Sequence, residues 1–281
     1  MADTLYIIGN GFDLHHGLRT SYTDFREYIK QKCSYLWNLL SDIYGDALYD
    51  NMWWCNFEEM LAQINFLHLM KSKNGEALGS MKIRNLLKGS LPPLLGSWIK
   101  KIGCNVDPDH SLGINLNPLF FSFNYTMLLE IVYGVKEDNV WHIHDSIKRP
   151  DDIVIGHDSD YRELFVRFNQ FRDDHPEEYI RMDITDMIIQ EVANGAKKVK
   201  ERIAQNENRF YDQYSWVKHF IAMGFSFNDI DMPYIEKIWS VNRHKDEANW
   251  TVYLHTPEDE SIIGRIIGLG VNERNIHTKN W

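Results

Sequence analysis

The stretch from Leu5 to Leu18 constrains the fold more than any other part of this 281-residue chain. A short apolar run, Leu5-Tyr6-Ile7-Ile8, leads into Gly9 and Gly11, and Gly17 follows six residues later. Such a run predicts a buried strand that ends in a tight turn. The turn could present backbone N–H groups to a pyrophosphate, or it could be a plain strand-to-helix turn that needs glycine at positive φ. The residues of the turn leave both interpretations open.

The composition excludes several classes of protein. With a net charge of −10 and no run of five like charges, the chain lacks the basic surface that nucleic acid requires. No segment approaches the length of an apolar membrane span, and we recognise no signal peptide. Three widely spaced cysteines, Cys33, Cys55 and Cys104, predict neither a disulfide framework nor a zinc site. We therefore expect a cytoplasmic protein with no nucleic-acid partner and no membrane contact.

Short apolar runs alternate with helical patterns along the chain. After the first strand, further strands are predicted at residues 119–123, 140–144, 152–156, 219–223, 250–254 and 275–277. Strands separated by helices form a mostly parallel sheet that helices flank on both faces. The sequence therefore predicts an α/β fold with a Rossmann-like sheet.

The helical patterns concentrate in two blocks, at about 22–102 and 161–216. Within them we expect a helix from Tyr22 to Leu40 that Gly45 terminates, and another from 81 to 102 that is interrupted near Pro92-Pro93. A later helix is expected at 258–268. We interpret the chain as one α/β nucleotide-binding domain, residues 1–281, with a helical subdomain split in sequence.

Polar residues follow several of the predicted strands. Asn124 follows the strand at 119–123, His144 ends the strand at 140–144, and Gly224 and Ser226 follow the strand at 219–223. In parallel sheets the ligand crevice lies beyond the carboxyl ends of the strands, so these residues are expected at one edge.

Each of these residues has two interpretations. Asn124 could hydrogen-bond a ribose hydroxyl or cap the next helix. His144 could be structural or a general base near neutral pH. The turn at Gly224 and Ser226 could hold half of a dinucleotide or only begin a helix. Asp13 would repel a phosphate, and it fits better as a cap or beside a ribose hydroxyl.

Other sites are not predicted. His142 and His144 project to one face of a strand, but a catalytic metal needs a third protein ligand, so no metal is expected. The sequence has neither GxxxxGK[ST] nor GxSxG. The GxGxxG fingerprint of dehydrogenases is not met, because Leu14 stands where its third glycine belongs.

Four segments resemble the bacteriophage abortive-infection AbiH family. Residues 7–22 (IIGNGFDLHHGLRTSY) closely resemble its opening motif. Residues 121–126 (FSFNYT), 142–144 (HIH) and 224–231 (GFSFNDID) look like its later blocks, in the same order. One departure is Asp145, which stands where the family's block usually continues with glycine.

The same blocks more distantly resemble the sirtuin-type NAD-binding domain, whose first loop has the spacing of Gly9, Gly11 and Gly17. This resemblance implies that Asn124 and His144 are catalytic, with Asn124 holding the ribose and a water that His144 activates. It also implies a set of cofactor-binding residues: Gly9, Asn10, Gly11, Phe12, Asp13, Gly17, Gly224 and Ser226. Within that set Gly9, Asn10 and Gly11 would cradle the pyrophosphate, while Asp13 and Ser226 would contact ribose hydroxyls.

Two functions follow from these resemblances. The first is a phage-defence protein that binds NAD, as substrate or ligand, and hydrolyses its nicotinamide–ribose bond. The second is a non-catalytic nucleotide-sensing module that acts through a protein partner. Either function allows a phage-derived trigger and a homo-oligomer.

Overall fold

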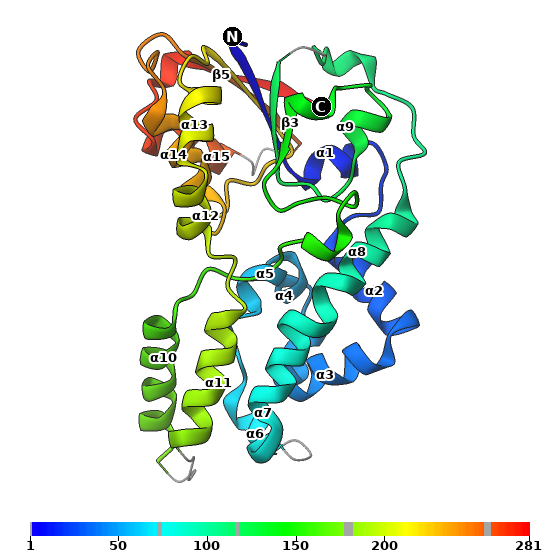
Figure 1. Ribbon diagram of the computed structural model, residues 1–281, viewed down its shortest axis with the longest axis vertical. Coiled ribbons are helices and arrows are strands. Elements are labelled where there is room, and N and C mark those ends of the chain that lie inside the picture. The colour runs from blue at the N-terminus through cyan, green and yellow to red at the C-terminus, as the bar shows by residue number, and fades with distance from the viewer. Residues whose placement is uncertain (1, 72–74, 116–117, 177–181, 256–259) are drawn as a thin grey trace. The chain divides into compact units, whose positions relative to one another are not determined.

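A computed structural model describes the chain except residues 1, 72–74, 116–117, 177–181 and 256–259 (Figure 1). The described residues form a six-stranded sheet in the order β3-β2-β1-β4-β5-β6. Its strands are β1 (Thr4–Ile8), β2 (Leu119–Ser122), β3 (Val140–His142), β4 (His219–Met223), β5 (Asn249–Leu254) and β6 (Ile276–Asn280). Every neighbouring pair is parallel. This is the strand order of dinucleotide-binding Rossmann folds, so the predicted fold class is confirmed.

The chain divides into two compact units. The first, which holds the sheet, comprises Met1–Thr20, Ile99–Asp152 and Val199–Trp281, and the second comprises Ser21–Trp98 and Ile153–Lys198. The second unit is helical and is split in sequence. The chain remains helical beyond residue 198, up to residue 214, but those helices belong to the first unit and pack against the sheet. The expectation of one nucleotide-binding domain stays a prediction.

Helices cover both faces of the sheet. On β1, Leu5 and Ile7 belong to one buried cluster and Tyr6 and Ile8 to another, as the alternation of side chains along a strand requires. The first cluster is covered by α12 (Val199–Gln205), α13 (Glu207–Tyr214), α14 (Met232–Val241) and α15 (Glu260–Gly268). The second is covered by α1 (Asn10–His15) and α9 (Leu128–Ile131), on the other side of the sheet in Figure 1. Short 3₁₀ turns complete this unit: η3 (His110–Leu112), η4 (Glu137–Asn139), η5 (Pro150–Asp152) and η7 (Glu273–Asn275).

The helices of the second unit are short. They are α2 (Tyr22–Lys32), α3 (Ser34–Tyr44), α4 (Asn51–Cys55), α5 (Phe57–Met60), α6 (Phe66–Lys71), α7 (Gly75–Arg84), α8 (Leu91–Ile102), α10 (Tyr161–Asp174) and α11 (Met182–Asn194). A 3₁₀ segment, η1 (Gly45–Tyr49), and a π-helical segment, η2 (Asn85–Ser90), join some of them. The last residues of α8, from Ile99 on, belong to the first unit.

Two helix predictions need correction. The helix expected from 22 to 40 is broken at Cys33, whose φ of −141° is not helical, although Gly45 does end α3 at a φ of +61°. Pro92-Pro93 do not interrupt a helix, because α8 continues directly from the π-helical segment before it. The irregular part is that segment, and its altered hydrogen bonding lies immediately before the two prolines. Part of the helix expected at 258–268, residues 258–259, lies outside the described residues.

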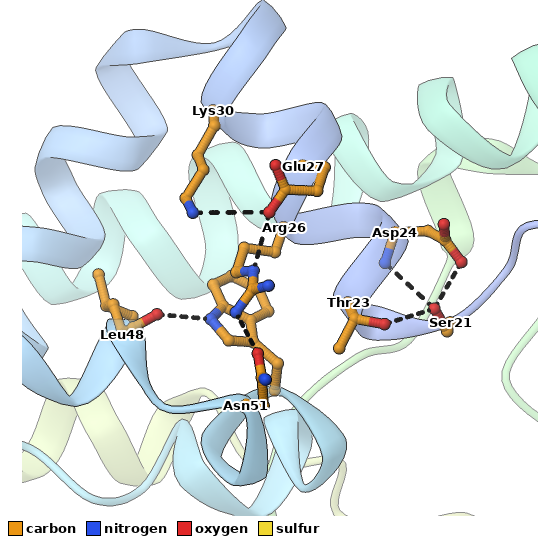
Figure 2. Close-up of polar contacts among 9 residues, drawn as sticks. Ser21, Thr23, Asp24, Arg26, Glu27, Lys30, Leu48 and Asn51 are labelled. Atoms are coloured by element: carbon orange, nitrogen blue, oxygen red, sulfur yellow. Dashed lines mark hydrogen bonds and ion pairs between the residues drawn. The ribbon is translucent and has the colours of Figure 1, made fainter.

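Side-chain contacts fix the start of the second unit (Figure 2). The Oγ of Ser21 accepts a hydrogen bond from the Asp24 N–H at 3.1 Å, which caps α2. The Trp54 indole N–H donates to the Leu48 carbonyl at 2.9 Å, so the side chain of α4 is tied to η1. These local bonds position short helices that propensity alone would leave marginal.

The strand predicted at 152–156 is wrong. Ile153 and Ile155 are buried, but this segment packs within the second unit and joins no strand. At Gly156 a Cβ would come within 2.2 Å of the Gly195 carbonyl oxygen, so the backbone lies directly against the end of α11. Next to it the His157 ring bonds the Val192 carbonyl at 2.9 Å. An apolar run marks burial, and here the burial is in the helical unit.

Backbone-to-backbone packing joins the turns that follow β1 and β4. The Gly9 N–H donates to the Met223 carbonyl at 3.0 Å and the Gly11 N–H to the Gly224 carbonyl at 2.9 Å. A Cβ added to Gly9 would lie 2.5 Å from the Gly224 carbonyl oxygen, and one added to Gly11 would lie 2.6 Å from the Gly224 Cα. At Gly224, which has a φ of +63°, a Cβ would lie 2.1 Å from the Phe12 nitrogen. No side chain fits between these two turns.

Replacing Gly224 with alanine should therefore destabilise the fold by about 3 kcal/mol or more, because the Cβ meets backbone and the left-handed φ is strained. The measurement is urea-induced unfolding followed by circular dichroism. Gly264→Ala is the matched control: Gly264 lies in α15 with open space at its Cβ, so this change should be neutral or stabilise by up to about 1 kcal/mol. Equal stability of the two variants would contradict the packing described.

Candidate functional site

A buried polar cluster lies beyond the carboxyl ends of β1 and β2, around Asp13. The Asp13 side chain, 1% exposed, projects from α1. Its Oδ1 accepts a hydrogen bond from the Asn124 side-chain amide at 2.9 Å, and its Oδ2 accepts one from the Thr126 hydroxyl at 2.8 Å. One carboxylate thus joins the loop after β1 to the loop after β2.

Burial changes the acidity of Asp13. Desolvation raises its pKa from 3.8 to about 7, while the hydrogen bonds from Thr126 and Asn124 act in the opposite direction. Near neutral pH the carboxyl group therefore exists in both protonation states. Both carboxylate oxygens of Asp13 accept hydrogen bonds from the protein, one from Asn124 and one from Thr126, and its expected contact with a ribose hydroxyl stays a prediction.

Asn124 keeps one unused acceptor. Its Nδ2 is engaged by Asp13, and its backbone carbonyl accepts a hydrogen bond from the His142 ring at 2.9 Å. Its Oδ1 is buried without a hydrogen-bond partner in the described part of the chain. A buried orphan acceptor is unfavourable by about 1–3 kcal/mol, and a hydroxyl or water that donated to it would recover that energy.

His144 faces Asp231, which comes from the loop after β4. The Nε2 of His144 and the Oδ1 of Asp231 are 3.2 Å apart, and the two side chains are 2% and 6% exposed. Asp231 occupies the N-cap position of α14 without capping it by its side chain, and the helix dipole there favours a carboxylate. The rings of Phe123 and Tyr234 lie about 6 Å from the imidazole. A histidine oriented by a carboxylate among aromatic rings is a suitable acid–base group.

Asp145, the residue that follows His144 in sequence, directs its carboxylate to two arginines. Its carboxylate pairs with Arg149 and lies 4.0 Å from Arg202. Its φ is +60°, the left-handed region that favours glycine. The glycine that the related motif usually has at this position is thus explained by the backbone, which Asp145 retains because aspartate tolerates this conformation better than most residues.

His142 is held by other protein groups. Its Nδ1 is 2.9 Å from the Asn124 carbonyl oxygen and its Nε2 is 2.8 Å from Oε1 of Glu130. Both ring nitrogens are therefore occupied, and Nδ1 must carry a proton because a carbonyl oxygen only accepts. Among the residues that the structure describes, no group of three His, Cys, Asp or Glu is arranged to hold a metal ion. No described helix has both the length and the apolarity to cross a membrane.

The predicted cofactor-binding residues lie at the β1 and β4 turns, with different exposure. Asn10, Gly17 and Ser226 are exposed, whereas the Phe12 side chain is fully buried in the core. The amides of Gly9 and Gly11 are already bonded to the β4 turn. A ligand here would contact the exposed groups first, and these eight residues remain predictions as binding residues.

Sequence reasoning missed two partners. Thr126 was not singled out although it stands in the same short block as Asn124, and only the fold brings its hydroxyl to Asp13. Asp231 lies in the segment 224–231 that resembles the family, but sequence did not identify it as the partner of His144. A strand-end position was a signal for both, since neighbouring parallel strands bring their carboxyl ends together.

Comparison with known proteins identifies one family. The chain matches the family model described as bacteriophage abortive infection AbiH over residues 5–86 and 77–254. A search of curated proteins finds no match.

The raised pKa of Asp13 gives a testable pH dependence. Between about pH 4 and 7 the folded protein keeps a proton on Asp13 that the unfolded chain has released, so stability falls as pH rises through this window. Asp13→Asn mimics the protonated carboxyl, so this variant should exceed wild type in stability at pH 8 by up to about 4 kcal/mol, and the difference should shrink towards pH 4. Urea unfolding across this pH range measures it.

Asp212→Asn is the control for that measurement, because it removes an exposed carboxylate of α13. Its difference from wild type should change less across this pH range than that of Asp13→Asn. A difference for Asp13→Asn that is constant from pH 4 to 8 would contradict the burial argument.

The left-handed backbone at Asp145 gives a second stability test. Asp145→Gly and Asp145→Ala both lose the Arg149 pair, but only alanine is strained at a φ of +60°. The glycine variant should therefore be the more stable of the two by about 1 kcal/mol in urea unfolding. At Asp212, which is helical, the order should reverse. The same order at both positions would rule out the explanation.

Proposed function

The chain belongs to the bacteriophage abortive infection AbiH family, which supports a role in abortive infection, and on this premise we propose that it binds NAD or a related nucleotide and hydrolyses the nicotinamide–ribose bond. The proposed relationship is to sirtuin-type NAD-binding domains. In this proposal NAD is the substrate, and its depletion stops the infected cell.

The observation that carries the proposal is the meeting of two glycine turns at the centre of the sheet. The strand order reverses between β1 and β4, and open α/β sheets bind nucleotides at such a switch point. The turns after these two strands contain Gly9, Gly11 and Gly224, and the exposed groups there are those of Asn10 and Ser226. Asn124 and His144 follow the next two strands on the same edge.

The residues on this edge suit the reaction. Cleavage breaks the bond between the ribose C1′ and the nicotinamide nitrogen, whose electron pair leaves with neutral nicotinamide. Water then bonds to C1′ and loses a proton, giving ADP-ribose. We assign that proton to His144, since Asp231 at 3.2 Å would stabilise the imidazolium. The Oδ1 of Asn124, which has no partner among the described residues, would accept a hydrogen bond from the water or from a ribose hydroxyl.

One observation favours the alternative of a nucleotide sensor without turnover. His144 is only 2% exposed and Asn124 only 6%. Groups this buried hold loops together as readily as they meet a substrate. In that function the same switch point binds the nucleotide, and the ligand leaves unchanged after signalling to a partner protein.

Nicotinamide release from NAD distinguishes the two functions. Purified protein, alone and with lysate of phage-infected cells, is incubated with NAD, and free nicotinamide is measured by chromatography. We expect His144→Ala to slow release by about 10²-fold or more and Asp231→Asn by about tenfold or more, with NAD affinity by calorimetry nearly unchanged. Ser226→Ala should instead weaken NAD binding.

His244→Ala is the control, because this histidine lies between α14 and the amino end of β5, beside Trp216, and not at the carboxyl ends of the strands. Its rate should equal that of wild type. If NAD binds but no nicotinamide is released with either preparation, the sensor is the correct function. If NAD does not bind at all, both functions fail. Release by His144→Ala at the wild-type rate would refute the residue assignment alone.

A further inference from the structure

The strand β3, which is outermost in the sheet, borders a cavity that the proposed nucleotide site does not use. Its volume is about 520 Å³, within the range of small-molecule sites. β3 contributes Trp141 and His142 to its lining, and α12 and α13 contribute Arg202 and Arg209. All of its lining residues belong to the first unit. None of the glycines at the β1 and β4 turns lies in it.

Arg209 brings a charge to this cavity that the described residues do not neutralise. Its guanidinium carbon lies 4.0 Å from the centre of the Trp141 ring, and its Nε donates to Oε1 of Gln213 at 3.3 Å. No ion pair joins it to a carboxylate of the described residues. Burial lowers the pKa of Arg209, which reflects the unfavourable placement of its charge. A half-buried cation of this kind is stabilised by an anion that enters the cavity.

Arg202 adds a second guanidinium. One of its terminal nitrogens donates to the Ile143 carbonyl at 2.9 Å, and Asp145 is 4.0 Å away. This hydrogen bond to the Ile143 carbonyl holds the Arg202 side chain next to the end of β3. The other cations of the lining, Lys148 and Arg149, are more exposed and pair with Glu137 and Asp145. Arginine forks match phosphoryl and carboxylate oxygens, so Arg202 and Arg209 together favour an anionic group.

Glu130 contributes a carboxylate to the lining of the cavity. Its Oε1 is bonded to His142 at 2.8 Å, whereas its Oε2 is buried without a hydrogen-bond partner in the described part of the chain. The Glu130 side chain is 8% exposed and belongs to the cavity lining. A carboxylate oxygen in this state needs a donor, such as a sugar hydroxyl.

We propose that this cavity is a second ligand site that binds a phosphorylated sugar, with the phosphoryl group at Arg202 and Arg209 and a hydroxyl donating to Glu130. The ligand therefore has both an anionic end and a donor end. None of the residues assigned to the proposed NAD site lines this cavity, so the two proposals can be tested separately.

Calorimetric titration of the full chain tests the proposal with four probes: ribose 5-phosphate, inorganic phosphate, ribose and gluconate. We expect ribose 5-phosphate to bind at least tenfold more tightly than each of the other three. The binding should weaken as salt is raised, because it depends on charge. Arg209→Gln should weaken ribose 5-phosphate binding at least tenfold.

The matched control is Arg243→Gln. Arg243 also stacks on aromatic rings, those of Tyr211 and Trp216, but it does not line the cavity. This variant should bind ribose 5-phosphate like wild type, and so should Ser226→Ala. An equal loss in Arg209→Gln and Arg243→Gln, with circular dichroism unchanged in both, would overturn the site.

The remaining outcomes are also decisive. No binding of ribose 5-phosphate at millimolar concentration overturns the proposal. Inorganic phosphate binding as tightly overturns the hydroxyl contact with Glu130, and gluconate binding as tightly overturns the phosphoryl preference. Loss of ribose 5-phosphate binding in Ser226→Ala would place that ligand in the nucleotide site instead. NAD binding that fails while ribose 5-phosphate binds would refute the proposed function and leave this site standing.

Discussion

The first unit depends on the contact between two turns that have no side chains between them. The N–H groups of Gly9 and Gly11 bond carbonyls of the β4 turn, and Gly224 approaches the Phe12 nitrogen more closely than any Cβ would allow. This contact continues the pairing of β1 with β4 beyond the strands themselves. It places the loops that follow the two central strands against each other, at the position where the strand order reverses. The packing of the two turns therefore requires these glycines, whether or not they also bind a ligand.

The polar groups around this contact are joined to one another. Asp13 links α1 to Asn124 and Thr126, and His144 meets Asp231 from the β4 side. Buried polar groups are retained in a fold when their hydrogen bonds are satisfied, and most of these are. In the part of the chain that the structure describes, the Oδ1 of Asn124 has no hydrogen-bond partner, which is the clearest chemical reason to consider a ligand here. Among the described residues, this edge of the sheet thus combines hydrogen bonds that join loops, an acceptor without a partner and a histidine–carboxylate pair.

Local pattern predicted the sheet well and the helical unit less well. The strands at β1, β2 and β4 were predicted almost to the residue because each is a continuous apolar run that both faces of the sheet bury. The run at 152–156 was misassigned because an apolar segment records burial without recording what it is buried against. Pro92-Pro93 were misjudged because a π-helical segment lies directly before them and the helix continues through it into α8. In the candidate site, the residues of the short blocks were identified, but their pairings were not.

The sequence by itself determined the alternation of strands and helices, the glycine turns and the polar residues at strand ends, because these are properties of neighbouring residues. Only the tertiary structure decided that Asp13 is enclosed by Asn124 and Thr126, and that Asp231, rather than the adjacent Asp145, faces His144. It alone joined Trp141, Glu130 and Arg209 around one cavity. These pairings unite residues that are distant in the chain, and the sheet order that brings them together leaves no local trace in sequence.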